Sequence, residues 1–259
     1  MRISVVSSSF FPMNRAGTMD VFGYLESMRY RYGLYTADIW NWSLASLDQE
    51  HIQAVRGALV EREMRLAALS TDGSHLWEDD PAARAYNHRM TLEHMRVAES
   101  MGANMVRIDA GAGVDTQTFG EEQIDLLATR YREYAQRAHD NGYKIGAENH
   151  YGAERNPLEM RRLAEAVDHP GFGLILHVGN WRGENADRGD AMTAPWTIHV
   201  HLPDSLTDEG LAEPMALLRN TGYVGTWCIE FEGGATYAQA GVMIARVQSV
   251  LEGWRLAGT

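Results

Sequence analysis

The chain has 259 residues, 45% of them hydrophobic, which is enough apolar material for one large domain with a buried core. Its formal net charge of −12 argues against a nucleic-acid partner, and its single cysteine, Cys228, excludes an internal disulfide and a cysteine-rich zinc site. The apolar run in MRISVVSSSF is too short for a signal peptide or a membrane span, so we expect a cytoplasmic enzyme with a small-molecule substrate and no membrane partner.

Short apolar runs alternate along the chain with longer amphipathic segments. The runs expected to be strands are Ile3–Ser7, Tyr35–Trp40, Arg65–Leu69, Met105–Ile108, Lys144–Glu148, Phe172–His177, Thr197–Leu202 and Thr226–Glu230. The segments expected to be helices include Leu47–Arg62, Pro81–Met101, Glu121–Asn141, Pro157–Val167, Glu209–Asn220 and Tyr237–Leu256. Several of these segments end at the Gly or Asn that commonly terminates a helix, at Gly102, Asn141 with Gly142, and Gly222.

Eight strands that alternate with helices over about 260 residues are typical of a (β/α)8 barrel. The alternative is a doubly wound open sheet, which usually has a glycine-rich turn after its first strand. The corresponding segment here reads SSSFFPMNR and contains no glycine. We therefore predict an α/β fold, a (β/α)8 TIM barrel that forms a single domain over residues 1–259.

Four of the predicted strands end in side chains that can bind a metal ion. Strand residues alternate in direction, and barrel enzymes place their functional groups at the carboxyl ends of the strands. This alternation sends Glu148, His177, His201 and Glu230 to the same rim. A lone Glu or His at a strand end is more often a solvated loop residue, but four on successive strands favour a metal site. Two carboxylates and two imidazoles suit Mn²⁺, Mg²⁺, Co²⁺ or Zn²⁺.

The segments around these residues resemble the motifs of a known family. They are AENHYG (147–152), LILHVGNW (174–181), HVHLPD (199–204) and CIEFEGG (228–234). The family is that of the xylose isomerase-like barrels, or sugar-phosphate isomerases/epimerases, with inosose dehydratase, tagatose-type epimerases, dehydroshikimate dehydratase and 3-keto-glycoside lyases among its members. AESMGANMVRIDAG (98–111) is similar to its fourth-strand region. The likeness runs from about residue 90 to 232, is loose before that, and does not specify a member.

The resemblance implies that Glu148, His201 and Glu230 bind one divalent metal ion, with Mn²⁺ as the first expectation. The family usually has an Asp ligand in the sixth strand, where this chain has His177. If His177 binds, the ligands carry two formal negative charges instead of three, and the ion is a stronger Lewis acid. If it does not, the site has three protein ligands and is more open. We favour His177 as a ligand.

Other residues at the predicted mouth allow two interpretations each. His150 shares a face with Glu148 and could carry a proton or orient a metal ligand. Arg107 could bind a substrate oxygen or form a salt bridge with a barrel carboxylate. Trp40 could stack on a sugar ring or pack in the core, and His75 could reach the substrate or be an ordinary surface residue.

Further polar residues follow the same alternation. In the seventh strand Ile198 would face the helices, while His199 would face the interior one step below His201 and serve as a core or supporting residue. Asp38 also has inward parity. Glu232 could be a base or a charge at the rim, and we favour the rim.

A metal ion with these ligands can bind adjacent hydroxyl and carbonyl oxygens, so that a carboxylate or imidazole removes the neighbouring C–H proton. We expect Glu148, His150 and Glu230 to be catalytic in the isomerisation or epimerisation of a sugar or keto-sugar. The alternative is a lyase that eliminates from a 3-keto-glycoside or keto-inositol. A metal-assisted hydrolase is less favoured because related endonucleases have more basic residues. A homo-oligomer or a hetero-subunit of a complex remains open.

Overall fold

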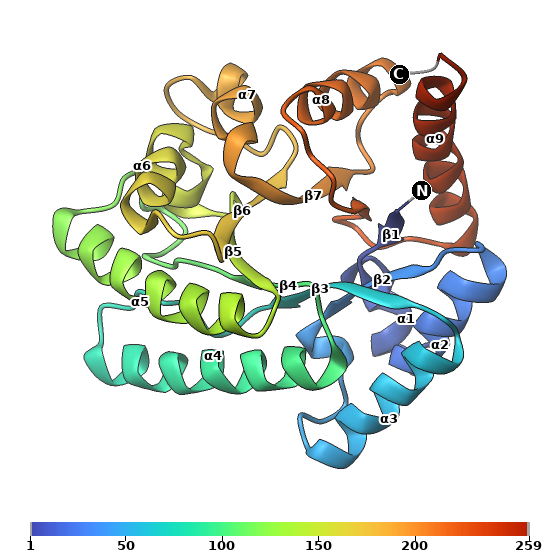
Figure 1. The fold of residues 1–259 in the computed structure, drawn as a ribbon, viewed down its shortest axis with the longest axis horizontal. Coiled ribbons are helices and arrows are strands. Elements are labelled where there is room, and N and C mark those ends of the chain that lie inside the picture. Colours follow the sequence, from blue (N-terminus) through green and yellow to red (C-terminus); the bar gives the residue numbers. More distant parts are fainter. Residues whose placement is uncertain (1, 258–259) are drawn as a thin grey trace.

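The computed structural model describes residues 2–257. Eight parallel strands form one sheet in the order β1-β8-β7-β6-β5-β4-β3-β2, surrounded by helices (Figure 1). The strands are β1 (Ile3–Val5), β2 (Thr36–Trp40), β3 (Arg65–Thr71), β4 (Met105–Ile108), β5 (Lys144–Glu148), β6 (Phe172–His177), β7 (Thr197–Pro203) and β8 (Trp227–Glu230). The predicted (β/α)8 TIM barrel is confirmed.

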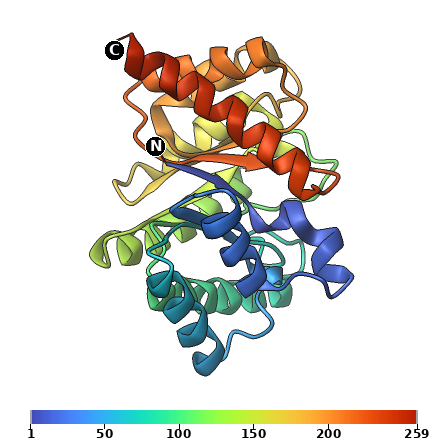
Figure 2. The same cartoon turned by 90° about the vertical axis from the view of Figure 1, so that its right-hand side faces the viewer.

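The α-helices of the described part cover the outside of the sheet. They are α1 (Phe11–Arg15), α2 (Val21–Glu26), α3 (Gln49–Glu61), α4 (Pro81–Met101), α5 (Glu121–Asp140), α6 (Pro157–Val167), α7 (Gly189–Thr193), α8 (Asp208–Asn220) and α9 (Tyr237–Leu256). The last helix, α9, packs against the first and last strands, β1 and β8 (Figure 2). Among the described residues, no helix is both long and apolar enough to cross a membrane.

Helix boundaries follow from local capping. Helix α4 begins with Pro81, and the Asp80 side chain accepts a hydrogen bond from the backbone N–H of Ala82. It ends at Gly102, whose φ of 74° is the left-handed conformation that a glycine adopts without strain. The predicted bounds of this helix are therefore confirmed.

The barrel closes at a narrow seam between β1 and β2. Val6 and Asp38 form an isolated parallel bridge there, whereas the other neighbouring strands pair through longer ladders. Side chains reinforce the seam: the Thr36 hydroxyl donates to the Ile3 carbonyl at 2.5 Å, and the Tyr24 hydroxyl donates to the Val5 carbonyl at 2.7 Å. The seam is the part of the barrel with the fewest strand-to-strand hydrogen bonds.

The barrel interior has its own small apolar cluster of Ala68, Met105 and Ile175, separate from the larger core under the helices. Gly146 leaves room for it, because a Cβ at this position would lie 2.7 Å from Ile175 Cδ1. These inward-facing residues have the same parity as the mouth residues of their strands. Strand alternation therefore directs functional side chains into the barrel above an apolar layer.

Candidate active site

The carboxyl ends of β5 to β8 bring together Glu148, His177, His201 and Glu230, which we call the mouth cluster. One ligand atom from each lies within 4.8 Å of the others. The Nδ1 atom of His201 is 2.7 Å from Glu148 Oε1 and 2.9 Å from Glu230 Oε2. The Nδ1 atom of His177 is 3.5 Å and 3.2 Å from the same two oxygens. Residues separated by more than 80 positions in the sequence thus converge as the strand alternation predicts.

Three side-chain atoms of the mouth-cluster residues are buried without a hydrogen-bond partner: His177 Nδ1, Glu230 Oε2 and His201 Nε2. The first two are only 3.2 Å apart. Buried polar groups are normally paired, so two such atoms that approach without bonding need a shared cause. Unpaired ligand atoms that lie this close together are typical of a cation site. The donor set and its orientation therefore fit a divalent metal ion.

Opposite charges keep the mouth carboxylates ionised. Burial by itself would raise the pKa of Glu148, but His201 and Arg107 hold it well below its usual range. The pKa of Glu230 is also lowered, because His201 and His177 outweigh its burial. Burial would lower the pKa of His177, yet the nearby carboxylates of Glu148 and Glu230 raise it to about 9. A metal ion that binds here must therefore displace protons from imidazole.

Arg107 fixes the orientation of Glu148. Its side chain is only 5% exposed, and Nη1 donates to Glu148 Oε2 at 2.6 Å. Its Nη2 forms ion pairs with Asp72 and, at 3.5 Å, with Asp109. Of the two predicted roles for Arg107, the structure shows the salt bridge. Since Glu148 Oε1 faces His201, both oxygens of this carboxylate have defined partners.

His150 and His75 lie at the edge of the mouth. The His150 side chain is 34% exposed, with Nδ1 3.4 Å from Asp109 Oδ2. Burial lowers its pKa, but the hydrogen bond to Asp109 prevails and the net pKa is raised. His75 hydrogen-bonds the hydroxyl of Tyr151, whose ring lies 5.0 Å from that of His150. Both histidines are near the mouth, and neither is a member of the mouth cluster.

Trp40 forms part of an aromatic wall beside the mouth cluster. Its ring contacts Phe11 edge-on at 5.3 Å, and its Nε1 donates to Asp72 Oδ2 at 2.7 Å. Trp40 and Phe11 line a cavity of about 230 Å³ together with Glu230 and Glu232. Trp40 is thus next to a candidate ligand and not in the barrel core. Glu232 is 74% exposed at the rim, 3.7 Å from His177 Nε2.

Several residues that support the site were not predicted. Asp109 has the same inward parity as Arg107, so the alternation test could have found it. The Asn149 side chain forms two hydrogen bonds with the backbone of His177 at the end of β6. Its Nδ2 donates to the His177 carbonyl at 2.8 Å, and its Oδ1 accepts from the His177 N–H at 2.7 Å. Glu154 is fully buried, and its Oε1 accepts from the Ala110 N–H at 2.6 Å. No local pattern distinguishes Glu154 from a surface glutamate.

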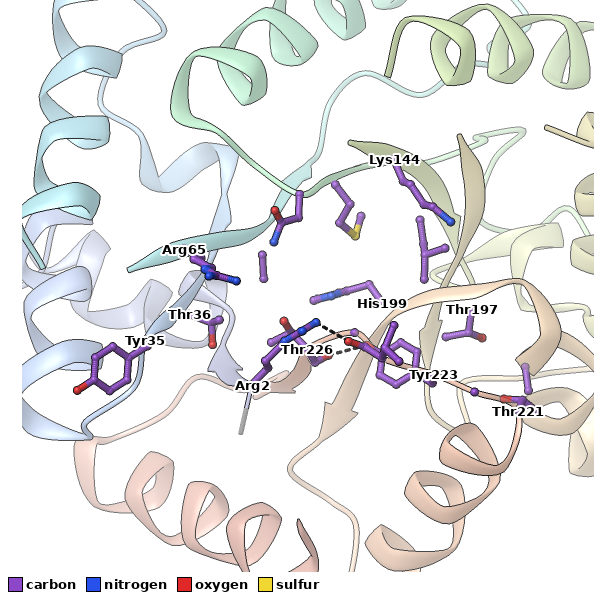
Figure 3. A pocket seen from close by; sticks show the side chains of 18 of the residues that line it. Arg2, Tyr35, Thr36, Arg65, Lys144, Thr197, His199, Thr221, Tyr223 and Thr226 are labelled. Atoms are coloured by element: carbon purple, nitrogen blue, oxygen red, sulfur yellow. Dashed lines mark hydrogen bonds between the residues drawn. The ribbon is translucent and has the colours of Figure 1, made fainter. Parts of the chain in front are cut away.

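The opposite end of the barrel contains a larger cavity of about 860 Å³, which we call the amino-end cavity. Arg2, Thr36, Arg65 and Lys144 line it from the starts of their strands, and His199 lies deeper in the barrel (Figure 3). Active sites of TIM barrels are at the carboxyl ends of the strands. Despite its size, we therefore do not assign the amino-end cavity as the active site.

A family model described as a xylose isomerase-like TIM barrel matches residues 31–246. The chain therefore belongs to the xylose isomerase-like TIM-barrel family, and the resemblance noted in the sequence is confirmed. No curated protein matches the chain in sequence.

Three solved structures are similar to this protein over almost the whole length of both chains. A xylose isomerase-like TIM-barrel protein from Mycobacterium smegmatis, in complex with magnesium, has a TM-score of 0.73 at 17% identity, covering 97% of this chain and 95% of that one. D-psicose 3-epimerase has a TM-score of 0.72 at 14% identity, with 99% of each chain covered. The 3-keto-D-glucoside 4-epimerase from E. coli has a TM-score of 0.74 at 15% identity, covering 97% of this chain and 99% of that one. At these identities the likeness shows the fold.

Proposed function

We propose that the protein is a divalent-metal-dependent enzyme that enolises a sugar or keto-sugar, with isomerisation or epimerisation as its reaction. The convergence of two carboxylates and two imidazoles at the mouth, with two buried ligand atoms unpaired, carries this proposal. The epimerases among the structures of the same fold support the substrate class.

Glu148, His177, His201 and Glu230 would hold the metal ion, with Mn²⁺ as the first expectation and Mg²⁺, Co²⁺ or Zn²⁺ as alternatives. The magnesium complex of one structure with the same fold supports a divalent cation. When bound, the ion would supply the Lewis acidity that polarises a carbonyl group and acidifies the neighbouring C–H.

Different residues of the site would bind the metal ion and transfer the protons. Both oxygens of Glu148 already have partners, Arg107 and His201. Glu148 is therefore better suited to binding the metal ion than to transferring a proton. Glu230 lines the mouth cavity and is the better placed carboxylate base. His150 has Asp109 at Nδ1, which leaves Nε2 available to give or take a proton.

The aromatic wall would bind the apolar face of a sugar ring. Trp40 and Phe11 border the mouth cavity, and the hydrogen bond from Trp40 Nε1 to Asp72 fixes the indole ring. A fixed aromatic surface costs little conformational entropy on binding. Arg107 would contribute by orienting Glu148, and His75 would contact only a substrate long enough to extend toward Tyr151.

A lyase that eliminates a β-oxygen is the second candidate. It shares the first proton abstraction and then needs a protonated group near the leaving oxygen. Its raised pKa makes His150 more readily protonated than an ordinary histidine. A probable dehydratase from Bacillus anthracis also has this fold, with a TM-score of 0.69 at 14% identity.

Reaction of a panel of keto-sugars in D2O tests the proposal. An epimerase or isomerase would incorporate deuterium at the carbon next to the carbonyl, whereas a lyase would release a leaving group and form an unsaturated ketone that absorbs in the ultraviolet. His150→Asn should slow C–H exchange far more than it weakens metal binding. Turnover without exchange and without a primary isotope effect, when chemistry limits the rate, would contradict enolisation and favour hydrolysis.

A further inference from the structure

A second group of metal-ligand side chains lies deeper in the barrel than the mouth cluster. It consists of Asp38 from β2, His199 and His201 from β7, and Cys228 from β8, and we call it the inner cluster. One ligand atom from each residue lies within 4.8 Å of the others. All four residues are at most 2% exposed. The group shares only His201 with the mouth cluster.

Three ligand atoms of the inner cluster are buried without a hydrogen-bond partner in the described part of the chain. They are Asp38 Oδ1, His199 Nε2 and His201 Nε2. Asp38 Oδ1 and His199 Nε2 are 2.9 Å apart, yet their orientation does not form a hydrogen bond. The mouth cluster has the same feature at His177 and Glu230. In both places, buried polar atoms lie close together without forming a hydrogen bond.

The charge of Asp38 also needs a partner. Its Oδ2 accepts a hydrogen bond from the Ser4 hydroxyl at 2.5 Å, and its Oδ1 is the unpaired atom. A buried carboxylate is costly unless an opposite charge compensates it. A hydrogen bond between His199 and Asp38 would pair two of these atoms but would leave His201 Nε2 unpaired. A cation between the side chains would satisfy all three atoms together.

We propose that the inner cluster is a second cation site, with four protein ligands and zinc as the preferred ion. A thiolate, two imidazoles and a carboxylate are typical zinc ligands, and a full set of four protein ligands marks a structural zinc site. The thiol of Cys228 would lose its proton to solvent on binding. With both sites filled, His201 would bridge them as an imidazolate, with Nδ1 in the mouth cluster and Nε2 in the inner cluster, and its remaining ring proton would also be released to solvent.

The location of the inner cluster suggests what such an ion would do. Its ligands come from β2 on one side of the seam and from β7 and β8 on the other, with β1 between them. Strands β1 and β2 are joined by the isolated bridge of Val6 and Asp38. An ion bound to Asp38 and Cys228 would therefore brace the barrel where its backbone pairing is weakest.

The ion could enter from the amino end of the barrel. His199 lines the amino-end cavity, and in Figure 3 its ring lies among the side chains that surround that cavity. The mouth site can be reached from the opposite end, through the cavity beside Trp40 and Glu230. The two sites would thus be filled from different faces and could be titrated separately.

Cobalt(II) substitution tests the inner site directly, because a thiolate ligand gives Co²⁺ a near-ultraviolet charge-transfer band. Cys228 is the only cysteine in the chain, so such a band can arise only from the inner cluster. Protein freed of metal with a chelator is loaded with Co²⁺, passed through a desalting column and measured by absorption and elemental analysis. We expect the charge-transfer band and two cobalt ions per chain.

Cys228→Ser should abolish the band and reduce the cobalt content from two ions to one, while circular dichroism shows that the fold is retained. Glu230→Gln is the matched control: it alters the mouth cluster and should leave the band in place. Metal removal should also lower the Tm of the wild type more than that of Cys228→Ser. Folded wild-type protein with no charge-transfer band at saturating Co²⁺ would overturn the proposal. A band that survives in Cys228→Ser would overturn it as well, and neither result bears on the mouth site.

Discussion

The two halves of the barrel contribute different side chains to the mouth. Strands β5 to β8 provide all four residues of the mouth cluster, namely Glu148, His177, His201 and Glu230. Strands β1 to β4 and the loops after them provide Arg107, Asp72, Asp109 and Trp40, which contact or surround that cluster. The second half therefore carries the candidate ligands, and the first half determines how they are oriented.

The difference shows how one sheet separates the binding of the metal ion from the orientation of its ligands. Within the first half, Asp72 contacts two of the surrounding residues: one of its oxygens pairs with Arg107 and the other accepts a hydrogen bond from Trp40 Nε1. The substrate wall and the arginine that holds Glu148 are thus joined through a single carboxylate. The loss of a ligand in the second half should remove the metal ion, whereas a variant in the first half should leave a site that binds metal less well.

Glu148→Gln should cause the largest loss. The substitution keeps the side-chain volume but removes an anionic ligand from the mouth cluster. Turnover should fall by about a thousandfold or more, because the ion supplies several kcal/mol of transition-state stabilisation and each ~1.4 kcal/mol is a factor of ten. Metal content and turnover are measured together. Glu252→Gln, the same change at an exposed position of α9, is the control, and full activity in Glu148→Gln would show that the site is elsewhere.

Arg107→Met tests the first half of the barrel. The change would leave Glu148, Asp72 and Asp109 without their shared cation, and breaking a buried ion pair costs about 3–5 kcal/mol. We expect this loss in the free energy of unfolding, measured by urea denaturation, together with weaker metal binding. Arg107→Lys should recover part of the stability but should not restore the orientation of Glu148, since lysine cannot bridge three carboxylates as a guanidinium does. Metal affinity equal to wild type in both variants would contradict an orienting role.

His177→Asp addresses the departure from the usual family ligand. The added carboxylate makes the ligand set more anionic, so the metal ion should be retained while its Lewis acidity falls. We expect turnover to drop by about 10- to 100-fold, the range seen when residues that tune a metal are changed, and metal affinity to change less. Isothermal titration and steady-state rates provide the comparison. If both quantities match the wild type, His177 is not a ligand.

Much of this arrangement is visible in the sequence because it depends on local periodicity. Strands β4, β5 and β6 have the bounds expected from their apolar runs, and alternation alone brings Glu148 and His177 to one rim. The first helical region was missed. Its residues form α2 and then a π-helical turn over Ser27–Arg31, so they lack one continuous helical period.

Other features depend on contacts between distant residues and could not be predicted. The pairing of Arg107 with Glu148 follows from the closure of the barrel, and the sequence gives two equal interpretations for this arginine. Ile198 was expected to face the helices, but the register between β6 and β7 shifts there. It lines the amino-end cavity instead. Such a bulge interrupts strict alternation without a clear sequence signal.

The smallest effect is expected at Glu154, where the two halves of the barrel meet. This residue follows β5 and accepts a hydrogen bond from Ala110, just after β4. Burial, and then the charge of Asp109, raise the pKa of Glu154 well above its usual value of 4.5. The folded protein therefore keeps a proton here that the unfolded chain has lost. Its unfolding free energy should fall as the pH rises above about 4.5 toward the raised pKa.

Glu154→Gln should remove this part of the pH dependence, because glutamine does not titrate and keeps the acceptor oxygen for the Ala110 N–H. The stability of the variant relative to wild type should increase between pH 5 and pH 8 by about 1 kcal/mol or more, as one unit of pKa difference is worth ~1.4 kcal/mol. Urea denaturation at both pH values measures it. Any change in unfolding free energy caused by the amide group itself is the same at both pH values, so it cancels when the two differences are compared. An equal difference at pH 5 and pH 8 would mean that Glu154 is ionised in the folded protein, and the junction between the halves would then contain a buried anion instead of a neutral acid.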